Sequence, residues 1–152
     1  MRVLRKLYSL LIRVASAFQP LLLLAVRLYW GWQFAQTGWG KLQHLDHVTK
    51  FFTSLGIPMP HANAIFIAVL EFAGGILLAL GLGARLVALL FVGDMVVAYI
   101  TADHDAFVSF ISNPDKFVGA TPFAFLLASL LILIFGPGRF SLDALLGRWF
   151  RK

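Results

Sequence analysis

The sequence predicts an all-α integral membrane protein, a four-helix bundle with short interfacial amphipathic helices. Of its 152 residues, 60% are hydrophobic and only 13% are charged, and the mean hydropathy is +0.84. This composition is too apolar for a water-soluble domain of this size. Four stretches approach the roughly 20 apolar residues that a helix needs to cross a hydrocarbon core about 30 Å thick. We therefore expect a single membrane domain over residues 1–152.

The four expected spans are runs of apolar residues bounded by charged or helix-breaking residues. They cover about residues 17–37, 62–82, 85–101 and 117–135. The segment from Leu10 to Ala17 resembles the apolar core of a signal peptide, but Arg13 interrupts it and another apolar stretch follows at once. We therefore expect the N-terminal segment to be retained.

Three shorter segments carry apolar residues at spacings of three and four, which predicts amphipathic helices on the membrane surface. They cover about residues 2–14, 41–55 and 141–151. The glycine and prolines of residues 56–60 end the second of these helices and lead the chain into the next span. Gly136-Pro137-Gly138 ends the last span, after which Ser141 can cap the final helix.

The distribution of Lys and Arg predicts the orientation in the membrane. Nine of the thirteen cations flank the spans on the side that holds both termini. Because Lys and Arg are enriched in cytoplasmic loops, we expect both termini in the cytoplasm. The formal net charge of +6 lies next to apolar spans, so these cations are expected to contact anionic membrane lipids and not nucleic acid.

Three ionisable side chains, Arg27, Glu71 and Asp94, each lie inside a different expected span. A charge at the bilayer centre costs at least about 2.5–3.5 kcal/mol, so it persists where it is paired, hydrated or functional. At about 1.5 Å per residue, all three fall near the midplane. We expect an intramembrane cluster in which Arg27 pairs with both carboxylates, or with one while the other holds a proton. An ion cluster that only fixes the order of the helices is an equal alternative.

Aromatic and polar residues on the first and third spans are candidates for a ligand pocket above this cluster: Tyr29, Trp30, Gln33 and Tyr99. In this interpretation Trp30 and Tyr99 form the walls, whereas an aromatic belt at the membrane interface is the structural alternative. Gly74 and Gly75 are predicted to let helix backbones pack closely beside Glu71.

The sequence favours neither a metal site nor a covalent cofactor. His44 and His47 are three residues apart, but no third ligand is evident, so solvated surface histidines are the preferred interpretation. The chain contains no cysteine, which excludes disulfide exchange, iron–sulfur clusters and covalent haem. Any redox role must take its electron carrier from elsewhere.

Several motifs, taken together in order and spacing, resemble the DoxX family of small bacterial membrane proteins. They are GWGKL at 38–42, FFTSLGIPMP at 51–60, Glu71 followed by Gly74-Gly75, GLGAR at 81–85, and GPGRFSLDALL at 136–146. The resemblance implies a four-helix protein of the bacterial inner membrane. The family is named from a subunit of an archaeal thiosulfate:quinone oxidoreductase, and relatives are proposed to act in redox and oxidative-stress complexes. It also implies that Arg27 and Glu71 correspond to the family's intramembrane polar positions.

Two functions of different classes follow, and a third is less favoured. The first is a redox-associated accessory subunit that binds a quinone or another lipid-like molecule at the charge cluster, while a redox or stress-response partner protein supplies the electrons. The second is a non-catalytic membrane scaffold or assembly factor. A small proton-coupled transporter is disfavoured because four spans without an evident repeat offer little for alternating access unless the chain dimerises. The sequence contains no autonomous catalytic motif and leaves a homo-oligomer open.

Overall fold

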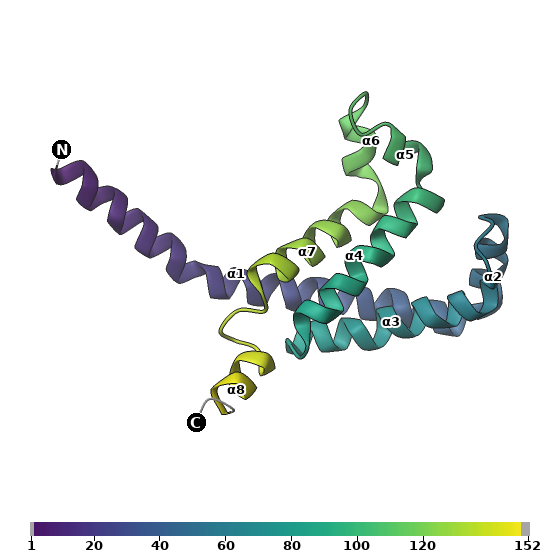
Figure 1. Cartoon of the computed structure of the whole chain (residues 1–152), viewed down its shortest axis with the longest axis horizontal. Coiled ribbons are helices and arrows are strands. Elements are labelled where there is room, and N and C mark those ends of the chain that lie inside the picture. The colour runs from purple at the N-terminus through teal and green to yellow at the C-terminus, as the bar shows by residue number, and fades with distance from the viewer. Residues whose placement is uncertain (1, 150–152) are drawn as a thin grey trace.

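The computed structural model describes residues 2–149, and these residues form eight α-helices (Figure 1). The helices are α1 (Arg2–Gln43), α2 (Leu45–Ser54), α3 (Pro60–Leu80), α4 (Ala84–Thr101), α5 (His104–Val108), α6 (Pro114–Gly119), α7 (Thr121–Phe135) and α8 (Leu142–Trp149). In this part of the chain, α1, α3 and α4 are long and apolar enough to cross a membrane, and α7 is a shorter apolar helix. The predicted all-helical class is confirmed, with four apolar helices in the bundle.

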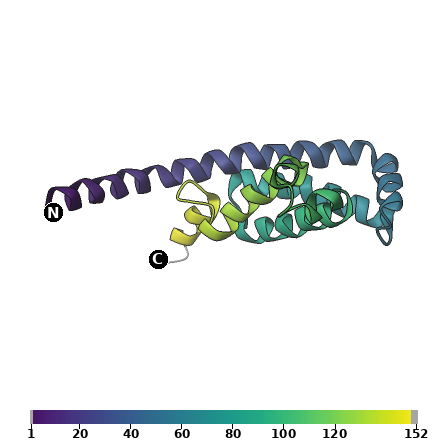
Figure 2. The ribbon, with the colours of Figure 1, turned by 90° about the horizontal axis from the view of Figure 1, so that it is seen from above.

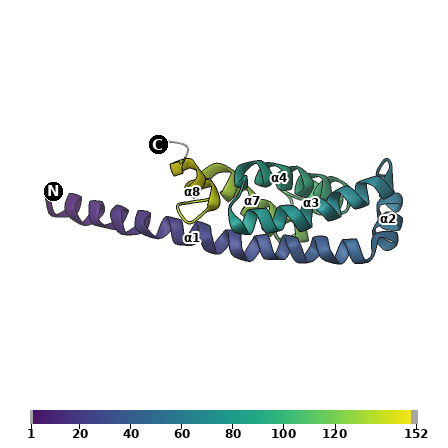
Figure 3. The same ribbon diagram turned by 90° about the horizontal axis from the view of Figure 1, so that it is seen from below.

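The four apolar helices pack as two pairs, α1 with α3 and α4 with α7. Helices α3 and α4 meet at a tight turn and diverge from it, so the two pairs form a V (Figure 1). Gly81 and Gly83 make this turn at φ 71° and 57°, backbone conformations that glycine adopts without steric cost. Figures 2 and 3 show α2 and α8 at opposite ends of the bundle, which we call the α2 end and the α8 end.

The two pairs are joined by an aromatic core. The ring of Phe34 on α1 stacks on Phe91 of α4 at a centroid distance of 3.7 Å. It also meets Phe125 of α7 edge-on at 4.7 Å. All of the Phe34 side chain is buried. Such pairs contribute about 0.5–1.5 kcal/mol beyond the area they bury, so this contact holds the two pairs together near the narrow part of the V.

Helix α1 corrects one prediction, because the expected surface helix 2–14 and the expected span 17–37 form one helix of 42 residues. Residues 2–19 contain neither glycine nor proline, so nothing ends the helix there. Pro20 lies inside α1 and removes only one backbone donor. At about 1.5 Å per residue α1 is roughly 63 Å long, about twice the hydrocarbon thickness. Its N-terminal part projects beyond the bundle at the α8 end (Figures 2 and 3).

The fourth span also differs from its prediction. It was expected over 117–135, but α7 begins at Thr121, and Ala120 is extended at φ −71° and ψ 144°. Pro122 explains the break. It has no backbone N–H to donate to the preceding turn, and its ring clashes with that turn, so a helix that contains Pro122 in its first turn does not extend toward residue 117. The preceding residues form α5 and α6 instead, tied to α4 by a hydrogen bond from the Tyr99 hydroxyl to the Phe117 carbonyl at 2.7 Å.

The remaining elements fall close to their expected bounds. Helices α3 and α4 begin and end within two residues of the spans 62–82 and 85–101. The surface helix expected over 41–55 is the shorter α2, since α1 continues through Lys41 and the chain breaks only at His44. Helix α8 lies within the expected 141–151, and Ser141 Oγ accepts the Ala144 N–H at 3.1 Å as the predicted cap. Residues 150 and 151 of that segment lie outside the described residues.

Candidate functional site

The site begins with the close contact between α1 and α3. Gly31 and Gly38 on α1 and Gly75 on α3 bring the two backbones into direct contact. A Cβ added to Gly31 would lie 2.7 Å from the Gly75 carbonyl oxygen, and one added to Gly75 would lie 2.5 Å from the Ala35 nitrogen. Small residues permit this approach between membrane helices. The contact fixes the depth and rotation of α1 relative to α3, and thereby which side chains can meet.

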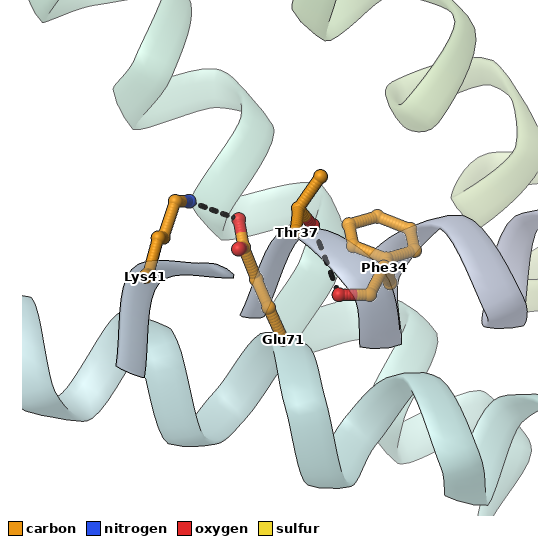
Figure 4. A network of polar contacts seen from close by, with 4 residues as sticks. All are labelled: Phe34, Thr37, Lys41 and Glu71. Atoms are coloured by element: carbon orange, nitrogen blue, oxygen red, sulfur yellow. Dashed lines mark hydrogen bonds and ion pairs between the residues drawn. The ribbon is translucent and has the colours of Figure 1, made fainter. Parts of the chain in front are cut away.

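One turn beyond Gly38, Lys41 of α1 reaches Glu71 of α3. The Lys41 Nζ and Glu71 Oε1 atoms are 2.5 Å apart, and the Glu71 residue is only 2% exposed. Figure 4 shows the two side chains pointing toward each other from adjacent helices. The Lys41 side chain is 31% exposed, whereas that of Glu71 is 3% exposed. This charge-assisted hydrogen bond is stronger than a neutral one because both groups are ionised.

Asp94 of α4 completes the polar part of the site. Its carboxyl group lies close enough to Glu71 and Lys41 to be influenced by both charges, and all three residues line one cavity. Glu71 Oε2 and Asp94 Oδ2 are buried and accept no hydrogen bond from any group in the described part of the chain. We call Lys41, Glu71 and Asp94 the polar triad. Two carboxylates and one ammonium group together carry one excess negative charge when all are ionised.

The cavity occupies the wide part of the V between α3 and α4 and has a volume of about 880 Å³. Apart from the polar triad, its walls are mostly apolar side chains from α2, α3 and α4. Phe66, Leu89 and Val97 belong to the walls and are each more than half exposed. The cavity therefore has a polar end deep between the spans and apolar walls that reach the lateral surface of the bundle.

Arg27 does not join this site, so the predicted cluster of Arg27 with the two carboxylates is wrong. The guanidinium group donates to the carbonyl oxygens of Pro137, Phe140 and Ala79 and is 1% exposed. Arg27 and Lys41 are fourteen residues apart on α1, about 21 Å along the axis. The expected depth of Arg27 was wrong because the span was expected to start at residue 17, whereas the first buried residue among the described side chains of α1 is Leu23. Arg27 consequently lies at the α8 end of the bundle, against Pro137 and Phe140.

Arg27 instead organises the connection between α7 and α8, together with Asp143. The Asp143 carboxylate accepts the N–H groups of Gly83 and Ala84 at 2.8 and 2.9 Å. The Asp143 N–H donates to the Gly81 carbonyl at 2.9 Å. A carboxylate at the first N–H groups of α4 also complements the positive end of that helix. We call Arg27 and Asp143 the α8 clamp, because they fasten the end of α7 and the start of α8 to α1 and to the α3–α4 turn.

The four residues predicted to form an aromatic ligand pocket do not line the cavity, so that prediction is wrong. Tyr99 is buried against Phe117, with ring centroids 4.7 Å apart. Trp30 packs edge-on against Phe125 of α7. Tyr29 is largely exposed and Gln33 is half-buried. The reason is rotational: these side chains lie on faces of α1 and α4 that turn away from α3.

Gly74 and Gly75 form two different contacts. Gly75 belongs to the α1–α3 contact, whereas a Cβ on Gly74 would lie 2.9 Å from the Phe91 ring of α4. Neighbouring glycines on α3 thus admit one helix on each side, and Glu71 lies one turn before them.

Two residues of these sites were missed by the sequence analysis, Lys41 and Asp143. Lys41 was expected at the start of the surface helix 41–55, although a signal for its burial was present. Arg27, Gly31, Phe34, Gly38 and Lys41 recur at spacings of three and four, which places Lys41 on the buried face of α1. Asp143 lies in the GPGRFSLDALL motif, but no local pattern indicates that its partner is the start of α4.

The chain is similar in sequence to known proteins over most of its length. The profile of the DoxX family matches residues 22–104, a range that contains Arg27 and the whole polar triad. The chain is 35% identical over 134 residues to the Inner membrane protein YphA of Escherichia coli (strain K12), covering 84% of this chain and 92% of that protein. It is 31% identical over 120 residues to the "Putative oxidoreductase CatD" of Bacillus subtilis (strain 168), covering 79% and 83%. No solved structure matches the chain.

The residues that match the family profile include α3, α4, the part of α1 from residue 22 onward, and the polar triad. With the apolar helices, the similarity to YphA indicates a multi-pass protein of the inner membrane. The match to the family profile covers more than half of the 152 residues, and the chain therefore belongs to the DoxX family.

Proposed function

We propose that this protein binds a lipid-like small molecule, with quinones as the favoured class, and serves as an accessory subunit of an inner-membrane redox system. The observation that carries the proposal is the cavity between α3 and α4, whose deep end holds Lys41, Glu71 and Asp94 and whose remaining walls are mostly apolar. A molecule with a polar ring and an apolar tail matches both parts.

The dimensions and the opening of the cavity support this class of ligand. Sites for small organic molecules usually have volumes of about 300–1,000 Å³, and this cavity has about 880 Å³. The exposed wall residues Phe66, Leu89 and Val97 lie on helices long enough to cross the membrane. An apolar molecule can therefore enter from the lipid without crossing water.

The polar triad supplies the chemistry that a ring with oxygen substituents requires. Lys41 can donate hydrogen bonds to the ligand, while Glu71 and Asp94 can accept them and can hold a proton at the cavity end. Reduction of a quinone consumes two electrons and two protons. The electrons in this proposal come from a redox or stress-response partner protein, and the name of CatD supports an oxidoreductase system as the setting.

The test is to purify the protein in a mild detergent, extract it with organic solvent and identify the extracted molecules by mass spectrometry. We expect a quinone in roughly molar amount with the unchanged chain and a loss of most of it in Lys41→Met and Glu71→Gln. Lys50→Met is the matched control, because Lys50 is exposed on α2 and does not line the cavity. Equal retention in all three variants, or no ligand in the unchanged chain and no binding of added quinone, would contradict the proposal.

A scaffold or assembly factor remains the second candidate, and the projecting part of α1 favours it. Leu4, Leu7, Leu11 and Phe18 are each more than 60% exposed there. A scaffold predicts that Lys41→Met and Glu71→Gln keep every protein that co-purifies with the unchanged chain. The ligand-binding proposal predicts that the same variants lose activity of the redox system.

A further inference from the structure

We propose that the polar triad selects a head group that donates hydrogen bonds, so that the cavity binds the reduced, hydroxyl form of a quinone more tightly than the oxidised, carbonyl form. This inference rests on the proposed function and specifies the chemistry of the ligand at that same site.

Two buried carboxyl oxygens of the polar triad have no hydrogen-bond donor among the described residues. Glu71 Oε2 and Asp94 Oδ2 are buried and accept no hydrogen bond within the part of the chain that the structure describes. Both residues line the cavity. A buried acceptor without a donor is costly, and the cost is larger for a charged group than for a neutral one. A hydroxyl group of the ligand would provide the missing donor, whereas a carbonyl group would add another acceptor.

The other polar residues of the cavity do not supply these donors. Asn63, Thr101 and His47 also line it, and none of them donates to Glu71 Oε2 or Asp94 Oδ2. Asn63 and Thr101 lie eight residues from Glu71 and seven from Asp94, about 12 and 10 Å along their helices. His47 is exposed near the start of α2. The Asn63 amide already donates to the Pro58 carbonyl and the Thr101 hydroxyl to the Val97 carbonyl. Apart from Lys41, the head of a ligand that reaches the polar triad is therefore the nearest source of hydrogen-bond donors.

Lys41 does not reverse this balance. Its ammonium group gives one of its three possible hydrogen bonds to Glu71 Oε1 and none to Glu71 Oε2 or Asp94 Oδ2. With Glu71 and Asp94 both ionised, two carboxylates against one ammonium group leave an excess of acceptors and of negative charge. A ring with two hydroxyl groups complements this excess, and a ring with two carbonyl groups does not.

The experiment compares decyl-ubiquinone with decyl-ubiquinol, which share one tail and differ in the oxygen substituents that the proposal concerns. Binding of each is measured to the full-length protein in nanodiscs under anaerobic conditions, by competition against a fixed concentration of radiolabelled decyl-ubiquinol. We expect the reduced form to bind about tenfold more tightly or better, the ratio that one hydrogen bond to a charged acceptor supplies. Equal affinities, or tighter binding of the oxidised form, would overturn the inference.

Two variants and one control locate the preference at the polar triad. Asp94→Asn and Glu71→Gln replace an acceptor by an amide that also donates, so the ratio of the two affinities should fall toward one. Asp94→Asn is the more informative of the two, because Glu71→Gln also removes the ion pair with Lys41. Thr101→Val changes the same cavity away from the carboxylates and should keep the preference. A preference that survives both amide variants would also overturn the inference.

The two proposals fail in different ways. If both forms bind with equal affinity, the cavity is still a quinone site and only the preference is wrong. If neither form binds to a protein whose circular dichroism shows the full helical content, the proposed function itself is wrong.

Discussion

Gly38→Ala is the smallest change that tests whether the backbone contact between α1 and α3 sets the site. The added Cβ would lie 2.8 Å from the Ala68 carbonyl oxygen and 2.8 Å from the backbone carbon of Glu71, and closer still to the Phe72 nitrogen. Ordinary contacts of this kind begin at 3.4 Å, so the two helices must separate or rotate. Because the backbone carbon of Glu71 is among the atoms that must move, the same movement displaces the ion pair between Glu71 and Lys41.

The cost can be isolated with Gly40→Ala, two residues along the same helix, where an added Cβ meets nothing within 4 Å. Both substitutions gain the same helix propensity, about 1 kcal/mol relative to glycine. Only Gly38→Ala adds overpacking, which typically costs about 1–3 kcal/mol. For a chain of 152 residues this difference corresponds to a separation of roughly 2–12 °C between the thermal midpoints of the two variants.

The assay is thermal unfolding followed by far-ultraviolet circular dichroism, with both variants in the same detergent at the same protein concentration. Gly40→Ala should unfold at or above the midpoint of the unchanged chain, and Gly38→Ala below it. Quinone retention should fall with Gly38→Ala and stay constant with Gly40→Ala. If the two variants unfold together and retain equal amounts, the close contact of α1 and α3 does not control the site.

Three further predictions concern the α8 clamp and Tyr99, each checked by the same unfolding assay. Arg27→Met should lower the free energy of unfolding by about 1–3 kcal/mol for each buried carbonyl left without its donor. Its control, Arg139→Met at an exposed position, should change the unfolding midpoint little. Similar midpoints of the two variants would show that the guanidinium contacts contribute nothing to stability. Asp143→Ala removes the acceptor for the first N–H groups of α4 and should cost about 0.5–2 kcal/mol, against no measurable loss for the exposed Asp115→Ala. Tyr99→Phe loses one hydrogen bond, about 0.5–1.5 kcal/mol, but should retain quinone fully, and a loss of quinone would return Tyr99 to the ligand site.

Much of the fold could be predicted because membrane helices are specified by local composition. The apolar stretches around Glu71 and Asp94 fall within two residues of α3 and α4, since glycines and charged residues bound both helices. The errors arose where a single proline decides a boundary. Pro20 does not interrupt α1, whereas Pro122 ends the backward extension of α7, and the outcome depends on the neighbouring packing that replaces the lost hydrogen bond.

The candidate site could be predicted only in part. Glu71 and Asp94 were expected to come together, and both line the cavity. Their cation was misassigned, since Lys41 and not Arg27 pairs with Glu71. The glycines at 31, 38 and 75 determine this outcome, because they place α1 against α3 at one axial position.

The sequence by itself determined that this protein is an all-helical membrane protein with ionisable groups inside its spans, because hydrophobicity and helical periodicity are properties of neighbouring residues. Only the tertiary structure decided which of these groups meet. A helix can slide along its neighbour and rotate about its own axis without any change in its own pattern of residues, so the pairing of Lys41 with Glu71 and of Arg27 with the α7–α8 connection follows from contacts between distant segments. Burial and hydrogen bonding favour one axial position of α1, and that position separates Arg27 from the two carboxylates.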